Sequence, residues 1–170
     1  TLAGKDVKAR EVSTEILRFL IMRLIIERLS RIGKSRGHGV HSPWAYSFIR
    51  DVLMETTPYY IYQDIDAQYS TNCERRKQKL LFRGRNFIKR DELHSFDMTA
   101  STVDDVLTFM RENSDCVAFV VEGIYASRAS YDKWAIIKDD EAVGVTFDLY
   151  SMAICFLRTD LKKQHYKLNF

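Results

Sequence analysis

The second half of the chain alternates between segments with helical spacing and short, continuous apolar runs, and this alternation restricts the fold more than any other feature. Residues 116–121 form an apolar run typical of a strand that is buried on both faces of a parallel sheet. The segments that begin at Ser101 and at Ser127 carry apolar residues at the 3.6-residue spacing of a helix. This order of helix, strand and helix predicts an α/β layered domain rather than a helical bundle or a β-sandwich.

More strands are predicted around this unit. Residues 143–149 and 152–157 are two apolar runs joined only by Tyr150 and Ser151, so we expect them to pair as an antiparallel hairpin. Residues 166–170 also have the pattern of a short strand. Residues 90–100 show no clear period, and we expect a loop or a short strand there.

The N-terminal segment is predicted to form one helix over residues 7–32, with an apolar face that contains Phe19, Met22, Ile25, Ile26, Leu29 and Ile32. The rest of its first half is apolar as well, so we expect burial against the domain or against a second subunit. The alternative is a basic amphipathic helix on a membrane surface. A transmembrane span or a signal peptide is not expected, because the most apolar stretch, residues 17–26, is short and contains Arg18 and Arg23.

Two more helices are expected in the first half of the chain. Ser42 and Pro43 suit the N-cap and the first position of a helix that ends near Pro58. A strongly basic helix follows over residues 73–89. Residues 75–90 carry eight Lys or Arg residues and no acid, spread round the helix, which fits either a solvated surface or a contact with RNA, anionic lipid or an acidic protein.

The composition is that of an ordinary globular domain. The chain has 170 residues, 46% of them hydrophobic and 29% charged, and its net charge of +3 is too small to indicate nucleic-acid binding. The three cysteines are far apart and lack metal-ligand spacing, so neither a disulfide framework nor a zinc site is predicted, and a cytoplasmic location fits best. We divide the chain into a helical region, 1–89, and an α/β region, 90–170.

Two passages of the sequence carry a family resemblance. Residues 36–44 read R-G-H-G-V-H-S-P-W, and Pro58, Tyr59 and Tyr60 follow at a distance. Near the other end lie V-V-E-G-I-Y-A-S at 120–127, V-T-F-D-L-Y at 145–150 and K-Q-H-Y at 163–166. These passages resemble the two ends of a group of small bacterial class I S-adenosylmethionine (SAM) methyltransferases, whose N-terminal motif contains His-Ser-Pro.

The resemblance implies a Rossmann-like methyltransferase sheet, here with an N-terminal helical extension and a C-terminal antiparallel strand pair, and SAM as cofactor. Residues 117–121, 143–149 and 152–157 would match the family's last strands. SAM binding in this fold depends on a glycine-rich turn after the first strand and on an acid that ends the second. None of the seven glycines follows an apolar strand with G-x-G spacing, so the SAM-binding residues stay unassigned. Residues 90–100 are too few to hold the family's first four strands.

Two functions therefore remain open. If an internal segment is absent from this sequence, the protein is a SAM-dependent methyltransferase that acts on an unidentified acceptor. If the sequence is continuous, the chain is a shortened relative that has lost SAM binding and serves as an interaction or assembly module. The candidate interactions are a homodimer through the N-terminal helix and an anionic partner at residues 75–90.

Five residues are candidates for a site. His41 precedes Ser-Pro at a helix start and would act in catalysis as a general base or substrate donor, or would only brace the turn. Glu122 and Asp148 end predicted strands, where open α/β sheets bind ligands, so we assign Glu122 to catalysis and Asp148 to substrate binding; surface or capping roles are the alternative. Tyr59 and Tyr60 would frame a pocket for a planar substrate or belong to the core. No metal site is predicted.

Overall fold

The computed structural model describes residues 39–113, 115–158 and 160–170, and, in the N-terminal segment, residues 18, 21, 22, 25–27, 29 and 31. The described residues between 18 and 29 are helical. The elements that follow are α2 (Pro43–Phe48), η1 (Ile49–Leu53), α3 (Ile61–Gln68), α4 (Asn72–Ile88), β1 (His94–Asp97), α5 (Val103–Glu112), β2 (Ala118–Glu122), α6 (Arg128–Asp139), β3 (Val145–Asp148), β4 (Met152–Phe156) and β5 (Gln164–Lys167).

The five strands form one mixed sheet in the order β1-β2-β4-β3-β5. β1 pairs with β2, and β3 with β5, in parallel, whereas β4 lies between β2 and β3 and is antiparallel to both. The predicted α/β layering and the predicted antiparallel pair of β3 with β4 are therefore confirmed. Because β4 alone is reversed, the carboxyl ends of β1, β2, β3 and β5 meet at one edge of the sheet.

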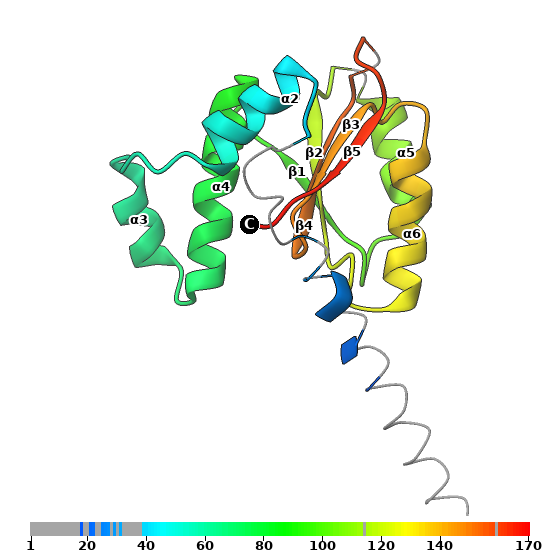
Figure 1. Ribbon diagram of the computed structural model, residues 1–170, viewed down its shortest axis with the longest axis horizontal. Helices are drawn as coiled ribbons and strands as arrows, with labels where there is room; N and C mark the ends of the chain where they lie inside the picture. The colour runs from blue at the N-terminus through cyan, green and yellow to red at the C-terminus, as the bar shows by residue number, and fades with distance from the viewer. Residues whose placement is uncertain are drawn as a thin grey trace, which may run out of the picture.

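Helices cover both faces of this sheet, as Figure 1 shows, with α2 and α4 on one side and α5 and α6 on the other. Alternate residues of each buried strand point to opposite faces, so Val120 and Phe147 join the core under α2 and α4, while Phe119 and Val121 join the core under α5 and α6. A central strand that is buried on both faces has the continuous apolar pattern seen in β2.

The core on the α2 side is rich in aromatic rings. Phe48 stacks on Phe147 with ring centroids 4.5 Å apart, and Trp44 meets Phe156 edge to face at 4.7 Å.

α2 starts as the sequence predicts, with Ser42 Oγ accepting a hydrogen bond from the Ala45 amide and with Pro43 in the first helical position. It continues as the π-helical turn η1, in which the Met54 amide donates to the Ile49 carbonyl.

The structure departs from the sequence expectations at four places. The last strand, β5, covers residues 164–167 rather than the expected 166–170. The second helix ends at Leu53, short of Pro58, and an additional helix, α3, follows it. α3 has one buried residue, Ile65, so it lacks the apolar stripe that would reveal it in the sequence. In the N-terminal helix, the described members of the apolar face are exposed rather than buried on the domain. Among the described residues, no helix is long and apolar enough to cross a bilayer.

Candidate functional site

The carboxyl edge of the sheet carries three acidic side chains. Asp97 ends β1, Glu122 ends β2 and Asp148 ends β3. Asp97 and Glu122 are register partners, which places these two strand ends level with each other. Open α/β sheets bind their ligands at this edge, so the contacts of the three carboxylates decide what the site accepts.

Asp148 is held by Arg31, which comes from the N-terminal segment and is fully buried. Arg31 Nη2 donates to Asp148 Oδ2 at 3.0 Å, and Nη1 donates to the Asp148 carbonyl at 2.7 Å and to the Leu168 carbonyl at 3.2 Å. The guanidinium therefore links the ends of β3 and β5 to a residue far away in the sequence. Burial by itself lowers the pKa of Arg31, but the hydrogen bond to Asp148 and the surrounding negative charges together raise that pKa.

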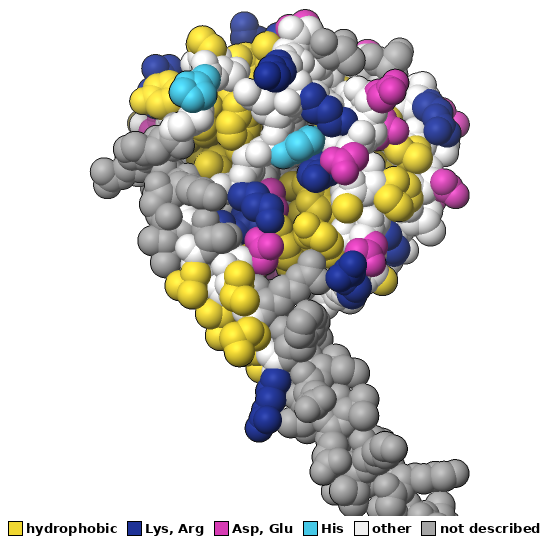
Figure 2. Space-filling model, turned by 45° about the vertical axis from the view of Figure 1, so that its right-hand side comes forward, with side chains coloured by type: hydrophobic (Ala, Val, Ile, Leu, Met, Phe, Trp, Pro, Cys, Tyr) yellow, Lys and Arg dark blue, Asp and Glu magenta, His cyan; other side chains and the backbone are white. Residues whose placement is uncertain are grey.

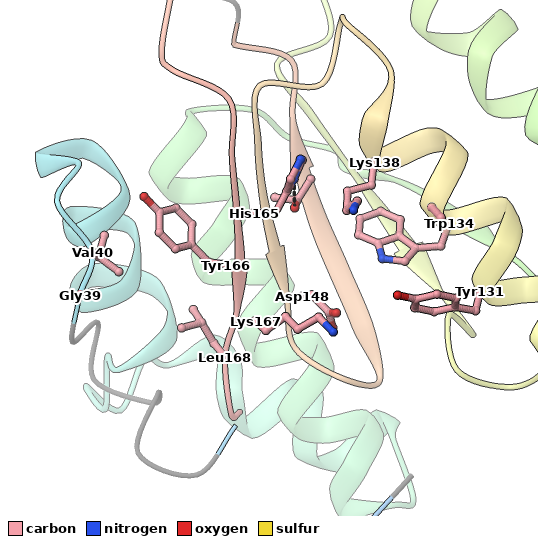
Figure 3. A pocket seen from close by; sticks show the side chains of 12 residues that line it. Gly39, Val40, Tyr131, Trp134, Lys138, Asp148, His165, Tyr166, Lys167 and Leu168 are labelled. Carbon is pink, nitrogen blue, oxygen red and sulfur yellow. Dashed lines mark hydrogen bonds between the residues drawn. The ribbon is translucent and has the colours of Figure 1, made fainter. Parts of the chain in front are cut away.

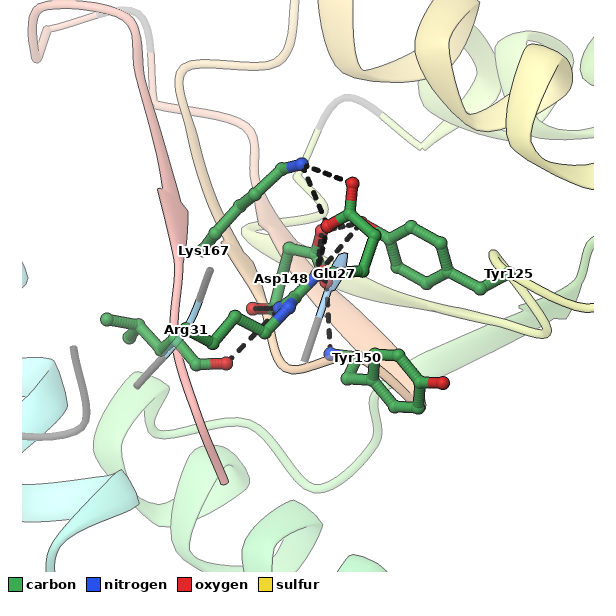
Figure 4. Close-up of polar contacts among 7 residues, drawn as sticks. Glu27, Arg31, Tyr125, Asp148, Tyr150 and Lys167 are labelled. Atoms are coloured by element: carbon green, nitrogen blue, oxygen red, sulfur yellow. Dashed lines mark hydrogen bonds and ion pairs between the residues drawn. The ribbon is translucent and has the colours of Figure 1, made fainter. Parts of the chain in front are cut away.

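Three more side chains complete this arrangement (Figure 4). Tyr125 donates its hydroxyl proton to Asp148 Oδ2 at 2.5 Å and accepts from Arg31 Nη2 at 2.9 Å. Burial and the charge of Asp148 raise the pKa of Tyr125, so its hydroxyl stays protonated. Glu27 lies 3.7 Å from Arg31 Nη2 and accepts from Lys167 at 3.2 Å. We call Glu27, Arg31, Tyr125, Asp148 and Lys167 the clamp.

Tyr150 covers the clamp from the turn between β3 and β4. Its ring is stacked on Tyr125 with centroids 5.5 Å apart, and the Arg31 guanidinium lies 5.6 Å from the Tyr150 centroid. Tyr150 has a φ of 76°, a left-handed conformation that is strained for a tyrosine, and its amide donates to Asp148 Oδ1 at 3.0 Å. Asp148 thus accepts hydrogen bonds from Arg31, Tyr125 and the Tyr150 amide.

The other two carboxylates also have partners within the chain. Glu122 forms an ion pair with Lys77 of α4 and accepts a hydrogen bond from the Ser95 hydroxyl at 2.6 Å. Asp97 accepts from both the amide and the hydroxyl of Thr99 at 2.8 Å, and these bonds lower the pKa of Asp97. All three acids at the carboxyl edge are therefore engaged by nearby side chains or amides.

Two cavities flank this edge. One, of about 390 Å³, lies between α6 and β5, with Trp134, Lys138 and His165 among its lining residues (Figure 3). His165 Nδ1 is 2.9 Å from Thr146 Oγ1. Burial and the charges of Lys138 and Lys163 lower the pKa of His165. The second cavity, of about 370 Å³, lies where the α4 N-terminus meets the β3–β4 turn, and Arg76 and Tyr150 line it.

The other predicted site residues lie elsewhere. His41 is exposed at the start of α2, where its neighbour Ser42 makes the capping bond. Tyr59 packs edge to face against Phe82 of α4, and Tyr60 is 95% exposed, so Tyr60 frames no pocket. Figure 1 shows α3, which these tyrosines precede, on the side of α4 away from the sheet. Of the predicted residues, the structure brings only Glu122 and Asp148 to the carboxyl edge.

Several cations of the basic segment 75–90 make contacts within the chain. Lys79 pairs with Asp66 at 2.6 Å, and Arg83 is buried, donating to the Val52 carbonyl at 2.6 Å and to Tyr62 Oη at 2.9 Å. Together with the pairing of Lys77, these contacts fix α4 to α3, η1 and the sheet. The anionic partner expected from the sequence stays a prediction.

Arg31 and Tyr125 are the site residues that sequence reasoning missed. Arg31 is one of several cations in the N-terminal helix, and nothing in the local pattern links it to a carboxylate 117 positions later. Tyr125 lies in a passage that carried the family resemblance, where it had no assigned role. A signal for Tyr125 was its place just beyond the end of a buried strand, at the edge where ligands bind.

The glycines at this edge do not fit SAM. Gly39 and Gly123 are the described glycines with positive φ, and Gly39 precedes α2 rather than following a strand. Gly123 follows β2, but a Cβ at this position would lie 2.7 Å from Asp97 Oδ1 and 3.2 Å from Thr99 Cγ2. Its missing side chain therefore makes room for Asp97 and Thr99, not for a cofactor. Within the part of the chain that the structure describes, no strand is followed by the glycine turn that cradles SAM.

Comparison with known proteins identified no relative of this chain. No protein-family model, curated protein or solved structure matches the chain. In the described ranges, no group of three or more His, Cys, Asp or Glu side chains is arranged to hold a metal ion. The contacts at the carboxyl edge are thus the basis for assigning a function.

Proposed function

We propose that this chain is a methyltransferase-like protein that serves as an assembly module and does not catalyse methyl transfer. The observation that carries the proposal is the position of Arg31, which is fully buried at the carboxyl edge and bonded to Asp148. The chain's own N-terminal segment takes the place that a ligand takes in open α/β sheets.

The sheet topology supports the methyltransferase-like part of the proposal. An antiparallel strand, β4, lies between the parallel strands β2 and β3, and α6 connects β2 to β3. The order along the chain of strand, helix, strand and antiparallel strand is the one that the family resemblance implies for the last strands. The similarity concerns these strands alone, because β1 is an edge strand among the described residues.

Energetics favour a permanent clamp over a ligand site. A ligand that bound Asp148 would have to displace Arg31 and leave a buried charge without its partner, at a cost of about 3 kcal/mol or more. The clamp also fixes the end of the N-terminal helix to the domain while the apolar residues of that helix stay exposed. A helix held in this way is suited to presenting a surface to another protein.

The first test is a calorimetric titration of the 170-residue chain with SAM. We expect no binding heat at sub-millimolar SAM, because no described strand is followed by the glycine turn and the three acids at the carboxyl edge are engaged within the chain. The variant Arg31→Met/Asp148→Asn, in which the clamp is open, should give the same result. Binding of SAM at micromolar concentration by a chain of verified mass would instead establish the methyltransferase alternative.

The second test asks whether the clamp holds the helix. In Arg31→Met, limited trypsin digestion should cut after the exposed Arg18 faster than in the wild-type protein. Arg50→Met is the matched control, because Arg50 forms an exposed ion pair with the adjacent Asp51. Equal cleavage rates in all three proteins would contradict the holding role of the clamp.

A further inference from the structure

The N-terminal helix exposes a row of large apolar side chains. Ile21, Met22, Ile25, Ile26 and Leu29 are between 47% and 60% exposed. Because helix residues are about 100° apart, these five fall within an arc of about 140°. Figure 2 shows hydrophobic side chains gathered on the outside of the molecule where the chain leads into this segment. We call these five residues the apolar stripe.

The polar contacts of the same helix lie on its opposite side. On the same helical geometry, Glu27 points about 170° away from the centre of the apolar stripe. Arg31 follows in the turn after the helix. Glu27 bonds to Lys167, and Arg31 bonds to Asp148, so this polar side faces the domain. A helix normally buries apolar side chains on its own domain, whereas the five residues of the apolar stripe are exposed here. The apolar stripe therefore requires a partner outside the domain.

We propose that the partner is a second copy of this chain, whose N-terminal helix packs antiparallel against the first. This inference rests on the proposed assembly function and names its partner. The stripe can pair with an identical antiparallel stripe across a two-fold axis that lies midway between residues 18 and 29. A two-fold axis at that point sets Met22 opposite the partner helix's Ile25 position and Ile21 opposite its Ile26 position, as an isologous dimer interface requires.

Charge supports the antiparallel direction. Arg18 is exposed and lies within the arc of the apolar stripe, at its N-terminal end. In the antiparallel pair, Arg18 of each copy comes level with the last turn of the other helix, where the carbonyl ends are partially negative. In a parallel pair, the two Arg18 side chains would meet each other. An arginine inside the stripe also disfavours burial of this face in the acyl region of a membrane.

The test measures the mass of the full chain in solution by light scattering after size-exclusion chromatography. We expect twice the 19.9 kDa of one chain. Ile26→Glu should raise the dimer dissociation constant by about tenfold or more, because it places a charge in the apolar interface. Ile136→Glu is the matched control, because Ile136 on α6 is 57% exposed, close to the 59% of Ile26, and it should leave the dimer unchanged.

The direction of the helices is tested by disulfide formation in a Cys73→Ser background. A mixture of Met22→Cys and Ile25→Cys chains should form a mixed disulfide faster than either variant alone, because the antiparallel pair brings these positions together. Preferential Met22→Cys self-linking would contradict the antiparallel pairing. Unchanged thermal unfolding of each variant, followed by circular dichroism, would show that the domain still folds.

Two results would overturn the proposed dimer. One is a monomer at micromolar concentration, and the other is a monomer that floats with anionic phosphatidylserine vesicles in high salt. Neither result depends on SAM binding, so the proposed dimer and the proposed function can be contradicted independently. A dimer that binds SAM would contradict only the proposed function, whereas a monomer that does not bind SAM would contradict only the choice of partner.

Discussion

The Arg31 guanidinium links the N-terminal segment to the ends of β3 and β5. Its loss would leave the Asp148 carboxylate buried beside Tyr125 without the positive charge that offsets desolvation. We predict that Arg31→Met lowers the free energy of unfolding by about 3 kcal/mol, as for other buried ion pairs broken on one side. Urea denaturation measures this loss.

Two comparisons make that prediction specific. Arg31→Met/Asp148→Leu should be more stable than Arg31→Met, because removing both charges leaves none buried alone. Arg50→Met should change stability little, since the Arg50–Asp51 pair is exposed. An Arg31→Met protein as stable as the wild type would mean that the clamp contributes nothing to folding.

At this residue scale, Asp148 is the only residue of the clamp that the sequence indicated. Asp148 and Glu122 were placed at strand ends because alternation and apolar runs show where a buried strand stops. Arg31 and Lys77 could not be assigned to them, because a pairing between distant segments leaves no local pattern. Tyr60 illustrates the opposite case: an aromatic cluster suggested a pocket, and the side chain is 95% exposed.

At the scale of elements, the His-Ser-Pro motif acts through its serine. Ser42 Oγ accepts from the Ala45 amide at the N-terminus of α2, whose residues Trp44 and Phe48 pack on the sheet. We predict that Ser42→Ala lowers the free energy of unfolding by about 1 kcal/mol, the usual loss of an N-cap. His41→Ala, which removes an exposed side chain, should leave stability unchanged in the same denaturation experiment.

The elements themselves differed in how far they could be predicted. From Ser101 to β4, capping residues and apolar runs placed each helix and strand close to its observed limits, whereas the last strand, predicted at 166–170, lies at 164–167. The sequence did not predict α3 and left β1 undecided between loop and strand, because each has a single buried side chain, Ile65 and Phe96 respectively. Packing against α4 and against β2 stabilises these short elements, and packing of that kind cannot be read from a window of sequence.

At the scale of the whole molecule, His165 makes stability depend on pH. Its folded pKa lies below the ordinary value of 6.5, chiefly through burial and also through Lys138 and Lys163, with Asp139 acting in the opposite direction. The unfolded chain therefore binds a proton more readily, and stability should fall as pH decreases from above 6.5 through the lowered folded pKa. Urea midpoints between pH 8 and pH 5 measure this, and His165→Gln should reduce the decrease. If His165→Gln leaves the decrease in stability unchanged, other titratable groups cause it.

The separation of Arg31 from Asp148 also has a consequence for synthesis. These residues are 117 positions apart, and ribosomes add roughly 5 to 20 residues per second. The N-terminal helix is therefore synthesised roughly 6 to 23 seconds before its carboxylate partner. During that time its apolar side chains have no folded domain beside them, and the loop to be closed is long. We expect nascent chains to be most prone to bind chaperones, or one another on the same messenger RNA, in this interval.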